Sequence, residues 1–200
     1  MTKTAAPMTS GSIWKQMTFF AMPIFLGNLF QQLYNTVDSL IVGNFLGSSA
    51  LAAVSSSGSL IFMLIGFLSG ISAGAGVIVA RFFGAGDEKN LQRAVHTTVA
   101  FGLVAGVLMT GVGVALSPQI LRWMDTPESV MRESVTYLQI YFAGSLGFVM
   151  YNVLVGILQA VGDSRHPLYY LIVSSVINLV LDLLFITGFH TGVGGAAVAT

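Results

Sequence analysis

Long apolar stretches, separated by short polar connections, constrain this 200-residue chain more than any other feature of its sequence. A membrane-spanning helix needs about 20 mostly apolar residues. Only 8% of the residues are charged, compared with about 25% in soluble domains. We therefore predict an all-α polytopic membrane protein. Five runs are long enough to span a bilayer, and they cover roughly residues 17–45, 50–82, 92–116, 130–160 and 167–189.

A sixth apolar run begins near Gly192 and reaches Thr200 without a signal for a helix end. A helix that stopped in mid-membrane would leave backbone carbonyls unpaired in lipid. We therefore expect residues 192–200 to be the truncated start of a sixth span, and the chain to be a fragment of a longer protein. Residues 1–16 are polar and form the expected tail before the first span.

The Lys and Arg residues predict the orientation in the membrane. Three connections that share one side, namely the N-terminal tail and residues 81–93 and 162–167, contain six of the eight Lys and Arg residues. The opposite connection, around residues 117–134, contains only Arg122 and Arg132. By the positive-inside rule we expect a multi-pass protein of the cell membrane with a cytoplasmic N-terminus.

Composition also argues against several classes of function. The formal net charge is zero, and no basic field suggests a nucleic-acid partner. The chain has no cysteine, so thiolate catalysis and cysteine-ligated metals are excluded. Its three histidines do not have the spacing of metal ligands. We expect no cofactor.

Glycines recur at helical spacing in two of the predicted spans. Gly66, Gly70 and Gly74 follow one another at four-residue intervals, as do Gly102 and Gly106. Small residues at this spacing form flat faces on which another membrane helix can pack closely. We expect a structural role for both stripes.

Two aspartates, Asp38 and Asp182, lie deep inside predicted spans. An aspartate at mid-bilayer costs roughly 2.5–3.5 kcal/mol on insertion scales, and such residues usually face a bundle interior or a watery cavity. Each belongs to a polar stripe at helical spacing. The stripe of the first span contains Asn28, Gln31, Asn35 and Asp38, and that of the fifth contains Asn178 and Asp182. The alternative is a buried polar clamp between helices.

The predicted depth in the membrane places both aspartates and Thr200 at one level. Asp38, Asp182 and Thr200 all lie about 12 Å inside the outer surface, at 1.5 Å of helical rise per residue. With Asn178 they would form an all-oxygen cluster able to hold a proton or Na⁺. Two carboxyls in a low dielectric cannot both ionise cheaply, and one bound cation relieves both penalties. We predict that cation binding at Asp38, Asn178, Asp182 and Thr200 is coupled to a conformational change.

Four segments resemble the multidrug and toxic compound extrusion (MATE) family: LFQQLYNTVDSLIVGNFLG, RFFGAGDEKNLQRA, GILQAVGDSRHPLYY and INLVLDLLFITG. Their order and spacing match over the whole chain. The resemblance implies the N-terminal six-helix lobe of a twelve-helix transporter, whose C-terminal lobe is the missing partner. Such transporters export amphipathic, often cationic, organic compounds by alternating access, driven by H⁺ or Na⁺. The cation site of bacterial and archaeal relatives matches the four residues named above.

The resemblance also implies roles for residues outside the predicted cation site. Gln31, Tyr34, Asn35 and Asn152 are expected to face the substrate. Pro23 lies a turn or two inside the first span, where a proline either bends a helix or simply marks its start. In relatives, a proline at this position is linked to bending of the first helix.

Other functions compete with cation-coupled efflux. A lipid-linked sugar flippase of the same superfamily would need a basic cavity for pyrophosphate, whereas the interior here carries acid and no Lys or Arg. An intramembrane aspartyl protease shares a proton between two aspartates. Its GxGD signature would lie within a span, whereas GAGD (84–87) lies in a connection. We expect a transporter rather than an enzyme. Without its second lobe, the fragment could also lack activity of its own.

Overall fold

The computed structural model describes residues 12–189 and 191–199, and these ranges contain helices and connections without a strand. This confirms the all-α prediction. The helices are α1 (Ile13–Leu46), α2 (Ser48–Gly84), α3 (Glu88–Trp123), α4 (Glu128–Ala143), α5 (Ser145–Ala160), α6 (Arg165–Leu183), the π-helical turn η1 (Leu184–Gly188) and α7 (Val193–Ala199).

Several of these helices are suited to a membrane. Among the described residues, α2 from Ala50, α3, and α6 continued through η1 are each long and apolar enough to span one. The bent pair of α4 and α5 would make a fourth span. α1 has 34 residues but carries the polar stripe of Gln31, Asn35 and Asp38, and it is not one of these helices.

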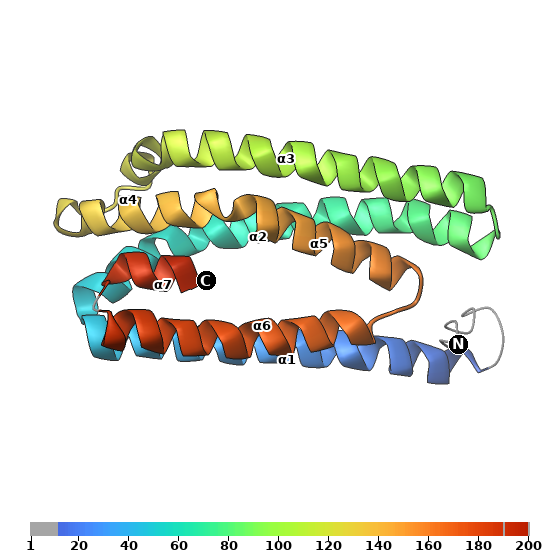
Figure 1. The fold of residues 1–200 in the computed structure, drawn as a ribbon, viewed down its shortest axis with the longest axis horizontal. Coiled ribbons are helices and arrows are strands. Elements are labelled where there is room, and N and C mark those ends of the chain that lie inside the picture. Colours follow the sequence, from blue (N-terminus) through green and yellow to red (C-terminus); the bar gives the residue numbers. More distant parts are fainter. Residues whose placement is uncertain (1–11, 190, 200) are drawn as a thin grey trace.

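The helices form two groups that run along a common axis (Figure 1). In the larger group, α2 and α3 pack against each other and against α4 and α5. In the smaller group, α1 packs along the whole of α6. The short α7 lies between the groups, where it contacts α4, α6, η1 and α1. The predicted polar stripes of the first and fifth spans therefore belong to neighbouring helices.

The connections are divided between the two ends of the bundle as the sequence predicts. The start of α1, the α2–α3 connection and the α5–α6 connection lie at one end (Figure 1). The α1–α2, α3–α4 and α6–α7 connections lie at the other. The first end carries the described residues Lys15, Arg81, Lys89, Arg93 and Arg165.

The run predicted at 130–160 is bent rather than straight. α4 and α5 meet at an angle of 49°, and Gly144 lies between them. Sharp bends in helices commonly occur at glycine. The bend could not be inferred from hydropathy, because the apolar character continues through it.

The two glycine stripes have different surroundings. A Cβ atom at Gly102 would lie 2.9 Å from Val153 Cγ2, and one at Gly106 would lie 2.6 Å from Leu146 Cδ1. α3 and α5 thus approach as closely as the sequence predicts. A Cβ atom at Gly66, Gly70 or Gly74 would meet no described atom within 4 Å. The predicted contact of the α2 stripe is therefore not made by the described residues.

Candidate functional site

The two intramembrane aspartates come from the neighbouring helices α1 and α6. The Asp38 and Asp182 carboxyls lie within hydrogen-bonding reach of each other. Asp182 is fully buried, with 0% of its surface exposed, and Asp38 is half-buried. The parallel packing of α1 on α6 explains the meeting, because the two helices lie side by side over their length (Figure 1).

Asn178 extends this pair by one helical turn. Its side chain is buried, and its Nδ2 donates a hydrogen bond to the Ala199 carbonyl oxygen at 2.7 Å. This bond ties the end of α7 to the acidic pair. Thr200, the fourth predicted member of the site, lies outside the described residues.

Several oxygen atoms of Asp38, Asn178 and Asp182 accept no hydrogen bond from the described residues. Four of them are buried and have no hydrogen-bond partner among the described residues: Asp38 Oδ1, Asn178 Oδ1, Asp182 Oδ1 and Asp182 Oδ2. Two ionised carboxylates can only accept hydrogen bonds, so they cannot satisfy each other. A shared proton or a bound cation would supply the missing positive charge.

The set of ligands limits which cation fits. No group of three or more His, Cys, Asp or Glu residues with metal-site geometry occurs in the described ranges. Two carboxyls and one amide oxygen are hard ligands, which suit H⁺ or Na⁺ better than a transition metal.

Tyr137 of α4 is a neighbour of the acidic pair that sequence reasoning missed. Its side chain is 5% exposed and lies within electrostatic range of Asp38, Asp182 and Tyr34. Nothing in the sequence singles it out, because it is uncharged and stands among other polar residues of α4, namely Ser134, Thr136 and Gln139. Its position depends on the packing of α4 against α7 and on the buried cluster that it shares with Ile41, Val42 and Ile186, which only tertiary packing reveals.

An apolar layer separates the acidic pair from one end of the bundle. Ile41 and Val42 lie about one turn beyond Asp38, and Ile186 lies one turn beyond Asp182. These residues form one buried cluster together with Ala50, Tyr137, Val193, Ala196 and Ala197. The cluster therefore covers the acidic pair on the side of the α1–α2 and α6–α7 connections.

The residues expected to face substrate are dispersed. Gln31 and Asn35 on α1 are exposed, and Tyr34 between them is half-buried. Asn152 lies on α5, where its Nδ2 donates to the Phe148 carbonyl oxygen at 2.8 Å. Pro23 is half-buried within α1, which continues as one helix on both sides of it.

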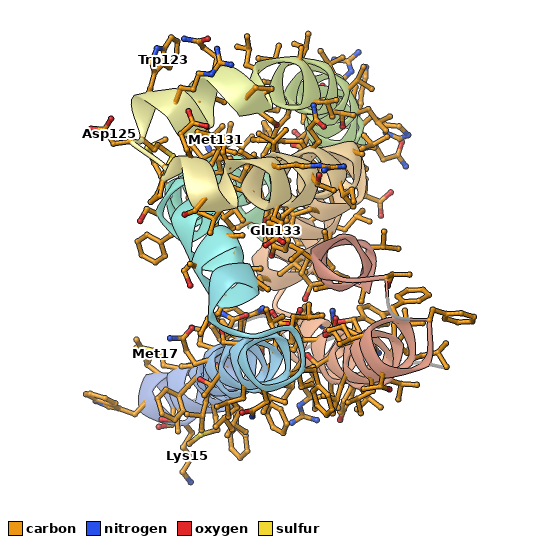
Figure 2. The ribbon with its side chains drawn as sticks, turned by 90° about the vertical axis from the view of Figure 1, so that its left-hand side faces the viewer. Lys15, Met17, Trp123, Asp125, Met131 and Glu133 are labelled. Atoms are coloured by element: carbon orange, nitrogen blue, oxygen red, sulfur yellow. The ribbon has the colours of Figure 1, made fainter. Side chains whose placement is uncertain are left out.

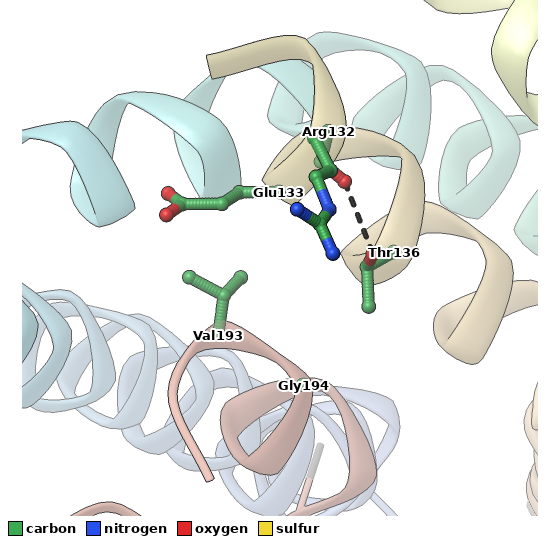
Figure 3. A pocket seen from close by; sticks show the side chains of 5 residues that line it. All are labelled: Arg132, Glu133, Thr136, Val193 and Gly194. Carbon is green, nitrogen blue, oxygen red and sulfur yellow. Dashed lines mark hydrogen bonds between the residues drawn. The ribbon is translucent and has the colours of Figure 1, made fainter. Parts of the chain in front are cut away.

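Two cavities lie beside α7, away from these residues. The first, of about 290 Å³, is lined by Arg132, Glu133, Thr136, Val193 and Gly194 (Figure 3). Thr136 Oγ1 donates to the Arg132 carbonyl oxygen at 3.0 Å in its wall. The second, of about 310 Å³, has a mainly apolar lining. None of the predicted site residues lines either cavity.

A bundle of apolar helices with a buried acidic cluster is the architecture of a polytopic membrane transporter. Residues 23–184 match the family model described as MatE. The chain belongs to this family, the MATE multidrug efflux transporters.

Individual relatives agree with this assignment. The chain is 37% identical to the probable multidrug resistance protein YoeA of Bacillus subtilis over 94% of its own length and 42% of that protein. It is similar to a MOP superfamily transporter of Pyrococcus furiosus, whose structure is described as having a binding pocket of reverse polarity that suggests a different function. That match has 28% identity and a TM-score of 0.90, and covers 99% of this chain and 44% of the other.

A third match is to another solved structure of the family. A MATE structure in the bent conformation has 29% identity and a TM-score of 0.88, and the match covers 95% of this chain and 42% of that one. The chain thus spans less than half the length of each of these relatives.

Proposed function

We propose that this chain forms the cation-coupling lobe of an antiporter that exports amphipathic, often cationic, organic compounds by alternating access. The coupling ion is H⁺ or Na⁺. The observation that carries the proposal is the cluster of four buried, donorless oxygen atoms on Asp38, Asn178 and Asp182. The family membership and the multidrug resistance protein among the relatives support the substrate class.

The cluster supplies a physical reason for coupling. Its groups come from α1 and α6, and the Asn178 bond to Ala199 links them to α7. Without a cation, desolvation and like charge disfavour holding the two carboxylates together. With a cation, the same groups draw the three helices toward one arrangement. A ligand that binds one arrangement more tightly shifts the population toward it.

The distribution of charge supports an orientation and a substrate polarity. Five of the described Lys and Arg residues lie at the end that contains the start of α1, which favours a cytoplasmic N-terminus in the cell membrane. The described interior site carries acid and no Lys or Arg. An acidic interior attracts organic cations and disfavours the pyrophosphate of a lipid-linked sugar.

An aspartyl protease is the competing enzyme class. Asp38 and Asp182 do form a carboxyl pair, as such an enzyme requires. The GAGD segment, however, lies at the α2–α3 connection, at the end of the bundle opposite to the α6–α7 connection. This placement supports transport rather than peptide cleavage.

The test uses the full-length protein in proteoliposomes that contain a fluorescent organic cation. A pH gradient and a Na⁺ gradient are imposed separately, and dye movement is followed. We expect Asp38→Asn and Asp182→Asn to reduce gradient-driven transport to the level of protein-free liposomes, because neither variant can hold the cation between two carboxyls. Asp125→Asn, an exposed acid in the α3–α4 connection, is the matched control and should keep the wild-type rate.

Two outcomes would contradict the proposal. The first is gradient-driven transport at the wild-type rate in Asp38→Asn. The second is cleavage of a membrane peptide that depends on Asp38 and Asp182, which would favour the protease.

A further inference from the structure

We propose that one end of the bundle is a binding surface for the headgroups of anionic phospholipids. This basic end is defined by Lys15 on α1, Arg81 on α2, Lys89 and Arg93 on α3, and Arg165 on α6. All five side chains are exposed. The inference concerns a partner of the protein other than its transported compound, and it does not depend on the proposed coupling mechanism.

In the α2–α3 connection, the first acidic residue, Asp87, caps the start of α3. Gly86 has a φ of +67°, a conformation that glycine adopts without strain. Asp87 follows, and its Oδ1 accepts the Asn90 backbone N–H at 3.1 Å while its Oδ2 accepts Asn90 Nδ2 at 2.6 Å. The Asp87 carboxylate is thus turned onto the start of α3, where the helix dipole favours a negative charge.

The α5–α6 connection has a similar pair of a glycine and a hydrogen-bonded aspartate. Gly162 has a φ of +87° and is followed by Asp163. Asp163 Oδ1 accepts the backbone N–H groups of Arg165 and His166, both at 3.2 Å. Asp163 Oδ2 pairs with His166 Nδ1. In both connections, therefore, a glycine in the left-handed conformation precedes an aspartate at a helix start. The aspartate carboxylate accepts hydrogen bonds from that helix start.

The basic end keeps a net positive charge, because its five described basic side chains outnumber its three described acids, although Asp87 lies within electrostatic range of Arg93. Of the three described acids at this end, Asp87 and Asp163 are held in caps, and only Glu88 remains beside the five basic side chains. The opposite end has the reverse balance, because Arg122 and Arg132 face three acids, namely Asp125, Glu128 and Glu133.

The aromatic side chains near the basic end favour a membrane interface as its surroundings. Trp14 is 81% exposed, and Tyr169 and Tyr170 are 56% and 54% exposed. Trp and Tyr with one apolar and one polar end concentrate at the level of lipid headgroups. Lys15 is adjacent to Trp14 in the sequence, and Arg165 lies about one helical turn before Tyr169, so these basic side chains reach the same layer.

The spread of the cations favours a lipid surface over a single soluble anion. They come from four helices, and none of them lines either cavity described above. On α3, Lys89 and Arg93 lie one turn apart and share a face. Lys and Arg arranged over a surface match a layer of phosphates better than one phosphate ion.

The experiment measures lipid enrichment around each end with the full-length protein in bilayers of equal phosphatidylglycerol and phosphatidylcholine. A reporter protein carries Phe83→Trp at the end of α2 and has all other tryptophans replaced by phenylalanine. A control protein keeps only Trp123, which points away from the bundle at the opposite end (Figure 2). Quenching is compared when either the phosphatidylglycerol or the phosphatidylcholine is brominated.

We expect about fivefold enrichment of phosphatidylglycerol at position 83 and none at Trp123. Lys89→Gln combined with Arg93→Gln should remove most of the enrichment, and Arg165→Gln alone should reduce it. Arg122→Gln combined with Arg132→Gln is the matched control and should leave it unchanged. All five positions are exposed, so these variants are expected to fold.

Equal quenching by both lipids at position 83 would overturn the proposal, as would enrichment that survives Lys89→Gln with Arg93→Gln. Displacement of the lipid by millimolar inorganic phosphate or by an acidic peptide would also overturn it, since the surface would then belong to a soluble anion. Because the readout is lipid contact, a failure of cation-coupled transport would not affect the result.

Discussion

At the scale of single residues, the carboxyl pair of Asp38 and Asp182 is the feature on which the account of function rests. The sequence indicated both aspartates and Asn178 because the cost of burying a charge in lipid makes such residues conspicuous. Tyr137 gave no comparable signal, since an uncharged tyrosine in a helix that also carries Ser134, Thr136 and Gln139 is ordinary. Its proximity to the pair depends on the packing of α4 against α7, which lies between the two helix groups.

A bound cation should stabilise the folded protein measurably. Because the cation binds the folded state, it raises the unfolding temperature in proportion to the logarithm of its concentration above the dissociation constant. We expect the melting temperature of the full-length protein in detergent to rise with added Na⁺ or with proton concentration, according to the coupling ion. In Asp38→Asn this dependence should be lost, whereas Glu133→Gln, which changes an exposed acid, should retain it. An unchanged dependence in Asp38→Asn would argue against the site.

The hydrogen bonds that Asp163 accepts at the start of α6 should make the stability of the protein depend on pH. Burial raises the pKa of the Asp163 carboxyl. The hydrogen bonds from the His166 backbone and ring and from the Arg165 N–H outweigh burial, so this pKa lies below its usual value. Its stabilising contribution is therefore present above about pH 4 and is lost as the pH falls through the lowered folded-state value. Asp163→Ala should cost about 1 kcal/mol at pH 7.

Thermal unfolding at several pH values measures this difference. The gap between wild type and Asp163→Ala should narrow in acid, below about pH 4. Glu133→Ala, at an exposed acid without a cap, is the comparison. A gap that stays constant from pH 7 into the acid range would show that the carboxylate charge does not contribute.

At the scale of helices, much of the arrangement follows from hydropathy and helical phase. Asp38 and Asp182 come from neighbouring helices as the stripes indicate, although Gln31 and Asn35 of the α1 stripe are exposed. Gly102 and Gly106 predicted the close approach of α3. The bend between α4 and α5 does not follow from hydropathy, which stays apolar overall across Gly144 and Ser145, although such a pair is a common site of helix bends. The open face of Gly66, Gly70 and Gly74 was not predictable either, because spacing shows that a helix can pack there and not which helix does.

Two neighbouring glycines of α3 provide a controlled test of its packing. A Cβ atom at Gly113 would overlap the ring of Phe142, whereas one at Gly111 would meet no described atom within 4 Å. We expect Gly113→Ala to destabilise the protein by about 1–3 kcal/mol through overpacking. Gly111→Ala should be neutral or slightly stabilising, because alanine favours a helix over glycine.

The measurement is the unfolding free energy in a detergent and denaturant series on the same preparation. Equal stability of the two variants would mean that Phe142 moves aside without cost, and that the α3 glycines do not hold α4 and α5 in place.

At the scale of the whole molecule, the two ends of the bundle differ in charge, and the apolar cluster covers the acidic pair on the side of the α1–α2 and α6–α7 connections. The sequence predicted the division of connections between the ends, because each span reverses the direction of the chain. It could not predict that α7 would lie between the two helix groups, since this depends on contacts of α4, α6 and η1.

The orientation can be tested directly, because the 200 residues contain no cysteine. In a full-length protein freed of any other cysteines, Asp125→Cys should react with a membrane-impermeant maleimide in intact cells. Lys89→Cys, at the opposite end, should react only after the cells are opened. Both positions are exposed, so a difference in labelling reports sidedness. The reverse pattern would place the N-terminus outside.

The central claim is that the oxygen cluster of Asp38, Asn178 and Asp182 holds the coupling cation. The most direct measurement counts the protons or Na⁺ ions that the purified full-length protein releases when it binds a saturating organic cation, with a pH electrode in weak buffer or with radioactive Na⁺. We predict release of about one cation per protein from this cluster, since two carboxyls share one charge. Release should disappear in both Asp38→Asn and Asp182→Asn and persist in Asp125→Asn. Undiminished release from the two aspartate variants would contradict the account.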